Sequence, residues 1–273
     1  MKTQRVCDRI EVTEVEAGVV EVALSRPDKM NALDPAMFDG LVEAAKWVRT
    51  IKGLRAVVLH GQGKAFCAGL DMGSFAAMAD GQGANMGNLL PREGSIANRA
   101  QQTAWAWRDL PVPVIAAVHG VAFGGGLQVA MGADVRFTDA QSKWSVLEIK
   151  WGLVPDMAGM PLLRELVRGD VLRDLTYTGR VVLGNEAQAL GLATHVVEAP
   201  LVAARAMAAQ IAGRSPHAVQ AGKRLLNALT DSSAAELLLA ETTEQVALIG
   251  SLNQVEAIRA GVSQRTPQFQ DVT

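Results

Sequence analysis

Two glycine-bearing segments contain the residues whose types and spacing could do chemistry. One follows an apolar run, Val114 to Val118, and places three consecutive glycines, Gly124 to Gly126, immediately before a helical pattern. Glycines at a strand-to-helix junction leave backbone N–H groups bare and let a ligand approach the main chain. The start of a helix also presents unpaired N–H donors and the positive end of its dipole. This segment could therefore hold a developing negative charge, although the glycines alone also fit a structural bend.

The second segment lies upstream, where a loop of small residues over 61–71 follows a buried strand pattern at Ala56 to His60. Two loops of this kind could each supply one N–H to a single oxygen. Neither loop matches the glycine spacing of a dinucleotide or phosphate cradle. The pair is therefore typical of a site that stabilises an oxyanion.

A proton carrier is needed beside such a site, and Glu148 is the candidate. It interrupts an apolar run shortly before Gly152. Apolar surroundings raise the pKa of a carboxyl toward neutrality, which suits acid–base work. A lone glutamate also fits a solvated surface charge, so the alternatives stay open on spacing alone. His119, although next to the glycines, is interpreted as a turn or core histidine, and Cys67 as a packed small residue.

Composition narrows the class of protein. The 273 residues are 49% hydrophobic and 20% charged, with a net charge of −2, as in a globular enzyme rather than a nucleic-acid-binding surface. Two cysteines indicate neither a disulfide framework nor a metal site, and a reducing, cytoplasmic location is expected. No signal peptide is visible. The uncharged stretch 110–133 could span a bilayer by length, but prolines and glycines interrupt it, so no membrane span is predicted.

Periodicity predicts an α/β protein. Strand and helix patterns alternate first, and helices follow. Asp34 and Pro35 form a helix start, as N-cap and first helical residue. Strands are predicted over 10–15, 19–24, 56–60, 114–118, 135–138 and 195–197, and helices over 35–49, 95–109, 157–167, 203–214, 218–229, 234–249 and 253–262. A mobile loop is expected over 80–91. The chain is divided into an α/β core, 1–195, and an α-helical region, 196–273.

Several motifs in the same order resemble the crotonase superfamily, also called the enoyl-CoA hydratase/isomerase family. They are Ala65-Phe66-Cys67-Ala68-Gly69-Leu70-Asp71, His119-Gly120-Val121-Ala122-Phe123-Gly124-Gly125-Gly126-Leu127-Gln128, Arg26-Pro27 with Asn31-Ala32-Leu33, and Gly152-Leu153-Val154-Pro155. The resemblance runs from about Ile10 to about Phe269. It implies a spiral of ββα units, with C-terminal helices that build a homotrimer or a homohexamer.

The resemblance also implies a substrate and a site. The substrate would be an acyl-CoA thioester whose carbonyl becomes enolate-like, with no metal or separate cofactor. The N–H groups of Ala68 and Gly125 would form the oxyanion hole, each donor contributing about 3 kcal/mol, and Glu148 would be catalytic. Lys29, Ala32, Leu70 and Asp71 match positions that contact CoA; Met30 and Met72 are candidates for the acyl pocket; Ala65, Gly69 and Gly124 complete the predicted substrate-binding set.

Gln128 departs from the hydratases of this family, which carry a first glutamate at that position. An amide can orient water but cannot accept its proton at neutral pH. Double-bond isomerisation, with Glu148 as a single proton shuttle, is therefore the leading hypothesis. Asp156, eight residues after Glu148, resembles the spacing in dienoyl-CoA isomerases and in hydroxyacyl-CoA hydrolases; it also fits an N-cap for the helix predicted to follow.

Three alternatives stay open. One is an enoyl-CoA hydratase in which Gln128 orients water. Another is a hydrolase of hydroxyacyl-CoA, and the third is a fold member that binds acyl-CoA without catalysis.

Overall fold

A computed structural model describes residues 2–81, 89–92 and 94–272. Its main sheet has seven strands in the order β1-β2-β3-β4-β5-β7-β10, and a second sheet has the order β6-β8-β9. The strands are β1 (Lys2–Val6), β2 (Ile10–Glu14), β3 (Val19–Leu24), β4 (Ala56–Gly61), β5 (Val114–Val118), β6 (Val121–Phe123), β7 (Val135–Thr138), β8 (Lys143–Ser145), β9 (Val182–Leu183) and β10 (His195–Val196). From β3 to β10 the main sheet is parallel, as alternating strands and helices predict.

Eleven α-helices and two short 3-10 helices are present in the described part of the chain. The α-helices are α1 (Pro35–Arg49), α2 (Met72–Ala79), α3 (Arg99–Arg108), α4 (Gly125–Met131), α5 (Gly159–Leu163), α6 (Gly169–Thr178), α7 (Gly184–Leu190), α8 (Pro200–Ala212), α9 (Pro216–Ala228), α10 (Ala234–Leu248) and α11 (Leu252–Val262). The 3-10 helices are η1 (Pro27–Lys29) and η2 (Glu148–Trp151).

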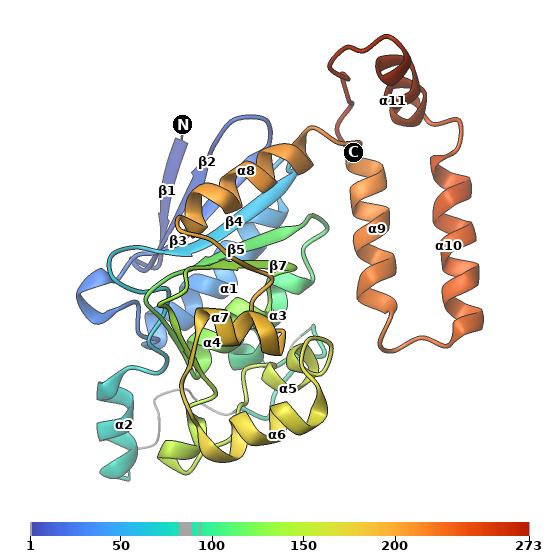
Figure 1. The fold of residues 1–273 in the computed structure, drawn as a ribbon. Helices are drawn as coiled ribbons and strands as arrows, with labels where there is room; N and C mark the ends of the chain where they lie inside the picture. Colours follow the sequence, from blue (N-terminus) through green and yellow to red (C-terminus); the bar gives the residue numbers. More distant parts are fainter. Residues whose placement is uncertain (1, 82–88, 93, 273) are drawn as a thin grey trace.

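Helices cover both faces of the main sheet. The larger apolar cluster joins one face of the sheet to α1, α3 and α4, and includes the fully buried Phe38 and Trp107. On the opposite face, Ala204 and Ala208 of α8 pack on Val58 and Ile115. Small alanines let this helix lie close to the β-branched residues of the parallel strands. Figure 1 shows the sheet between these layers.

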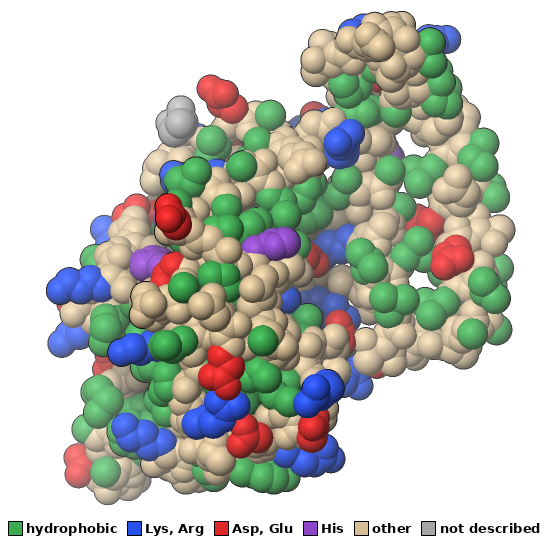
Figure 2. All heavy atoms as spheres, in the orientation of Figure 1, with side chains coloured by type: hydrophobic (Ala, Val, Ile, Leu, Met, Phe, Trp, Pro, Cys, Tyr) green, Lys and Arg blue, Asp and Glu red, His purple; other side chains and the backbone are tan. Residues whose placement is uncertain are grey.

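The helical region divides between α8 and α9, rather than at the predicted boundary of 195 and 196. Helix α8 belongs with the core because it contacts β4, β5 and β7. Helices α9, α10 and α11, here called the C-terminal arm, extend away from the sheet (Figure 1). In Figure 2 the arm stands apart from the body with hydrophobic side chains on its surface. The core and arm therefore differ in how they bury apolar residues.

Most of the predicted strands and helices lie close to the ranges predicted from the sequence, because local signals set where they begin. Asp34 caps α1 by accepting a hydrogen bond from the Met37 N–H. Helix α3 begins at Arg99 rather than near residue 95, because Asn98 forms a capping box with Gln101. Most of the loop predicted over 80–91 lies outside the described residues. No helix in the described ranges is both long and apolar enough to cross a membrane.

Candidate active site

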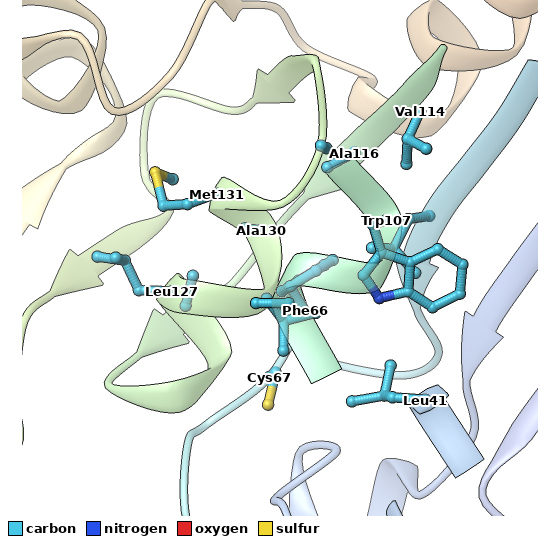
Figure 3. Packing of buried hydrophobic residues seen from close by; sticks show 14 of the residues in the cluster. Leu41, Phe66, Cys67, Trp107, Val114, Ala116, Leu127, Ala130 and Met131 are labelled. Carbon is cyan, nitrogen blue, oxygen red and sulfur yellow. The ribbon is translucent and has the colours of Figure 1, made fainter. Parts of the chain in front are cut away.

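The two glycine-bearing segments meet edge to edge. Cys67 forms a parallel bridge with Ala122, and the Phe123 N–H donates to the Cys67 carbonyl at 3.1 Å. Gly69 has φ +87°, and a Cβ there would lie 2.6 Å from the Phe123 carbonyl oxygen and 3.8 Å from the Gly125 nitrogen. Glycine is therefore required for this close approach. Figure 3 shows Phe66 and Cys67 beside Leu127 and Ala130 of α4, so packed core supports both segments from behind.

The upstream loop offers a different donor from the one predicted. The Ala68 N–H donates to the Met30 carbonyl at 3.0 Å, so it is already engaged. The Leu33 N–H donates to the Gly69 carbonyl, and the Asp71 N–H donates to the Leu33 carbonyl. Between these two bonds, the Leu70 N–H has no acceptor among the described residues. Ala68 is therefore not the free donor that the sequence analysis predicted, and the free N–H of this loop belongs to Leu70.

Gly125 supplies the second free donor. It is the first residue of α4, and the first N–H groups of a helix have no partner within it. Nothing in the described part of the chain accepts a bond from this N–H. A Cβ on Gly125 would lie 2.6 Å from the Met157 sulfur and 2.7 Å from Leu33 Cδ1. A side chain at this position would therefore collide with the packing around the donor.

Glu148 lies against the glycine turn, at the start of η2. A Cβ on Gly124 would be 3.4 Å from Glu148 Oε1, and the Gln128 side-chain N–H donates to the same oxygen at 2.6 Å. The other oxygen, Oε2, is buried and has no partner among the described residues. Burial raises the pKa of Glu148, the Gln128 hydrogen bond opposes that rise, and repulsion from Asp156 adds to it. One carboxylate oxygen is therefore held and the other is free.

Asp156 is not the helix cap that the sequence also allowed. Helix α5 begins at Gly159, with Ala158 as its N-cap and no side-chain cap. The residue is exposed overall, and no described residue donates a side-chain hydrogen bond to its carboxylate. Burial of the carboxyl by surrounding protein nevertheless raises its pKa. Asp156 is therefore a second carboxyl near Glu148 that local structure does not consume.

Gln128 is almost completely buried, with 1% of its surface exposed. Its side-chain oxygen accepts the N–H groups of Met157 and Gly159 at 2.8 and 2.9 Å. Both lone pairs of that oxygen are thus in use, and its nitrogen donates to Glu148. The side chain faces protein rather than open space.

The predicted CoA-contacting loop is held by two residues whose roles the sequence analysis did not assign, Arg26 and Asn31. The Asn31 side chain donates to the carbonyls of Gln62 and Ala65 at 2.9 and 2.8 Å. Arg26 pairs with Asp71 at 2.6 Å. The signal was present in the Arg-Pro and Asn-Ala-Leu motif, but only the fold shows that these side chains brace the loop.

The remaining predicted substrate residues divide by exposure. Met30 and Met72 are 46% and 64% exposed, Lys29 is exposed, and Ala32 and Ala65 are buried. Asp71 caps α2 through the Gly73 N–H, and this bond and Arg26 outweigh burial, so its pKa is lowered. Asp71 is thereby committed to holding α2 in place.

An aromatic contact links α2 to the helix that carries Glu148. Phe75 stacks on Trp151, with ring centroids 4.2 Å apart. Stacked rings favour a defined separation between the two segments. Phe75 of α2 is therefore held against the last residue of the short helix that begins at Glu148.

Cys67 behaves as a packed thiol, as the sequence suggested. Its side chain donates to the Asn31 carbonyl at 3.1 Å, and complete burial raises its pKa to about 12. A thiol with this pKa does not form the thiolate that a nucleophile needs. His119 lies at the turn, within 3.0 Å of the Gly63 carbonyl through Nε2. Among the described residues, no group of three or more His, Cys, Asp or Glu side chains could hold a metal ion.

Comparison with known proteins shows the family of this chain. A family model described as Enoyl-CoA hydratase/isomerase matches residues 14–272. The chain belongs to the enoyl-CoA hydratase/isomerase family. The "Delta(3,5)-Delta(2,4)-dienoyl-CoA isomerase, mitochondrial" of Mus musculus is 30% identical over 263 residues, which cover 94% of this chain and 80% of the relative. The "Probable enoyl-CoA hydratase echA8" of Mycobacterium bovis is 32% identical over 260 residues, with 94% and 96% covered.

Solved structures give the same result. A crystal structure of an enoyl-CoA hydratase from Polaromonas sp. JS666 is 27% identical, with a TM-score of 0.84, and the match covers 96% of this chain and 99% of that one. The predicted crotonase-type α/β fold, including its helical C-terminal region, is therefore confirmed. The chain is an enzyme of the hydratase/isomerase family. Hydratases and isomerases share the family, so membership alone does not specify the reaction.

Proposed function

We propose that this enzyme moves a double bond along an acyl-CoA thioester, with Glu148 as the proton shuttle. The observation that carries the proposal is the state of the Glu148 carboxylate. Its Oε1 is held by Gln128, its Oε2 is buried without a partner among the described residues, and the carboxylate lies against Gly124, the residue before the free Gly125 N–H. A raised pKa suits a group that must take up a proton and return it near neutral pH.

The thioester oxygen would accept hydrogen bonds from the Leu70 and Gly125 N–H groups. Ionised Glu148 would then remove a proton from C2, and the electrons of that C–H bond would form an enolate conjugated to the existing double bond. Preorganised donors stabilise the charge as it develops, by about 3 kcal/mol for each donor. Return of the proton to C4 of a 3-enoyl ester would give the 2-enoyl ester, with no atoms gained or lost.

Asp156 supports an extension of this reaction to dienoyl esters. In a 3,5-dienoyl thioester the proton leaves C2 and a proton is delivered at C6, which is a longer transfer. Two carboxyls with raised pKa values, Glu148 and Asp156, could serve the two ends. The mouse relative named as a dienoyl-CoA isomerase is consistent with this substrate.

Hydration is the second candidate, because relatives and structural neighbours are named as hydratases. The two bonds from Met157 and Gly159 to the Gln128 oxygen argue against it, since that oxygen has no lone pair left for a water. If the enzyme is already a hydratase, Gln128→Glu should change hydration little. A large gain would mean that hydration had been lost at this position.

One mixed-substrate assay tests the proposal. Purified protein is incubated with 3-enoyl-, 3,5-dienoyl-, 2-enoyl- and 3-hydroxyacyl-CoA esters, and products are read by mass and absorbance. A shift of the double bond without a change in mass is expected. Addition of water to the 2-enoyl ester would establish the hydratase, release of free CoA thiol the hydrolase, and binding without exchange of deuterium at C2 a non-catalytic member.

We also propose that a second copy covers the apolar face of the C-terminal arm in a homotrimer or homohexamer. Leu238, Leu239 and Val246 of α10 are each at least 65% exposed. Exposed apolar area of this kind is typical of an interaction surface. We further propose that no metal or separate cofactor takes part, and that the enzyme acts in the cytoplasm.

A further inference from the structure

Gln128 makes three side-chain hydrogen bonds, and they join two separate parts of the site. Its nitrogen donates to Glu148 Oε1 at 2.6 Å. Its oxygen accepts from Met157 and Gly159, on either side of Ala158 and directly after Asp156. One buried amide therefore contacts both the proton shuttle and the loop that carries the second carboxyl.

The loop is shaped around the Gln128 oxygen. Ala158 has φ +65°, in the left-handed region that non-glycine residues rarely adopt. This conformation turns the Met157 and Gly159 N–H groups toward one point, forming a small concave pair of donors that suits an oxygen. A Cβ on Gly159 would lie 2.6 Å from Gln128 Oε1. Both the left-handed turn and the glycine thus fit the loop to this side chain.

We infer that Gln128 is a positioning residue, which fixes Glu148 Oε2 toward the substrate and couples that carboxylate to the loop of Asp156. The inference rests on the proposed proton transfer. It assigns the residue no contact with substrate, because all the side-chain bonds described run to protein. It differs from a water-orienting role, in which the amide oxygen would have to be free.

The amide matters because it is a neutral donor and acceptor at once. If Gln128 were a glutamate, one oxygen could still accept from the loop, but the other would face Glu148 Oε1 at 2.6 Å. Two carboxylates this close cannot both be ionised, so one would retain a proton. Asp156 is the other charged group that acts on Glu148, and its repulsion favours the same protonation. The amide keeps Glu148 available as a base.

Two substitutions separate the bond that Gln128 makes to Glu148 from the two bonds that it makes to the loop. Gln128→Glu keeps the acceptor for the loop but replaces the neutral amide donor to Glu148 by a titratable carboxyl, and Gln128→Met removes both the acceptor and the donor. Gln188→Met is the control, because the Gln188 side chain donates to the Thr194 carbonyl at 3.2 Å, outside the site. The readouts are the pH profile of kcat/KM, the separate values of kcat and KM, and hydrogen exchange at the Met157 and Gly159 amides in the free protein.

For Gln128→Glu we expect the acidic limb of the pH profile to move up by about one pH unit or more, with both amides still protected from exchange. For Gln128→Met we expect kcat to fall by about 10²-fold with a smaller change in KM, and the two amides to lose protection. Gln188→Met should change neither the profile nor these amides.

An unchanged pH profile in Gln128→Glu, or full kcat and protected amides in Gln128→Met, would overturn the inference. A wild-type enzyme that moves no proton on any of the four thioesters would instead refute the proposed function. In that case loss of amide protection in Gln128→Met would still support the inference that Gln128 holds the loop, and retained protection would reject it.

Discussion

The core and the C-terminal arm use similar residues in opposite ways. In the core, helix α1 buries seven residues, among them Phe38 and Leu41, against the sheet. In the arm, α10 buries none, although Leu237, Leu238 and Leu239 follow one another in its sequence. Apolar composition therefore does not by itself determine whether a helix buries its apolar residues in the core of its own chain or leaves them exposed. Under the proposed assembly the difference also separates chemistry from association, because the candidate site lies wholly in the core.

The largest expected effect concerns the core alone. Glu148→Gln removes the proton acceptor but keeps the shape of the side chain, so kcat for double-bond transfer should fall by about 10³-fold. Thioester binding and oligomeric state should be unchanged, as measured by calorimetry and sedimentation. Glu43→Gln, on the exposed surface of α1, is the control. Retention of full turnover would remove Glu148 from the mechanism.

The next effect concerns the arm alone. Replacing both Leu238 and Leu239 by Asp puts charge on the exposed face of α10, where each covered leucine would contribute about 2 kcal/mol to association. The sedimentation mass should fall to that of a smaller species, while the thermal unfolding of the core persists. Gln141→Asp adds charge to the exposed core surface and should leave the mass unchanged. An unchanged mass in the leucine variant would mean that this face is not the interface.

A third prediction concerns the junction between the two regions. Lys223 of α9 is buried, and its ammonium group donates to the Val112 carbonyl and to Asp134, both at 2.8 Å. Lys223→Met would leave Asp134 without its buried partner and should cost about 3 kcal/mol of unfolding free energy. Denaturant titration measures the loss. Arg224→Met, which removes an exposed pair with Glu244, should cost less than about 1 kcal/mol. Equal losses of unfolding free energy in both variants would show that the buried Lys223 contributes no more than an exposed ion pair.

The smallest expected effect lies where α8 joins the core. His60, followed by Arg205 of α8, lowers the pKa of Glu21 from 4.5 to about 2. A lowered carboxyl pKa contributes stability that is present above pH 4.5 and is lost as pH falls toward 2. Because the pair is partly exposed to solvent, we expect a contribution of only about 1 kcal/mol. Denaturation at pH 6 and pH 3 should therefore differ less in Glu21→Gln than in the wild type, and equal differences would contradict the assignment.

Much of the fold could be predicted from sequence because the signals are local. Asp34 before Pro35 marked the start of α1, and the apolar runs marked β3, β4 and β5. The strand–helix alternation was sufficient for a parallel sheet. Local patterns could not show that α8 packs on the sheet while α9 leaves it, since the alanine-rich sequence of one and the amphipathic sequence of the other both predict only a helix. Their separation depends on contacts with distant strands.

The candidate site also combines features that residue type and order predict with features that only contacts between distant segments determine. The sequence by itself determined the glycines, the Glu148 carboxylate and the substitution of Gln128, because these are matters of residue type and order. Only the tertiary structure decided that the free N–H belongs to Leu70 rather than Ala68, since the acceptor of each N–H depends on the register between the loop and residues 30–33. It also decided that Asp156 caps no helix and that Gln128 faces Met157 and Gly159. A motif specifies which groups are present, whereas hydrogen bonds between distant segments determine which of them remain free to react.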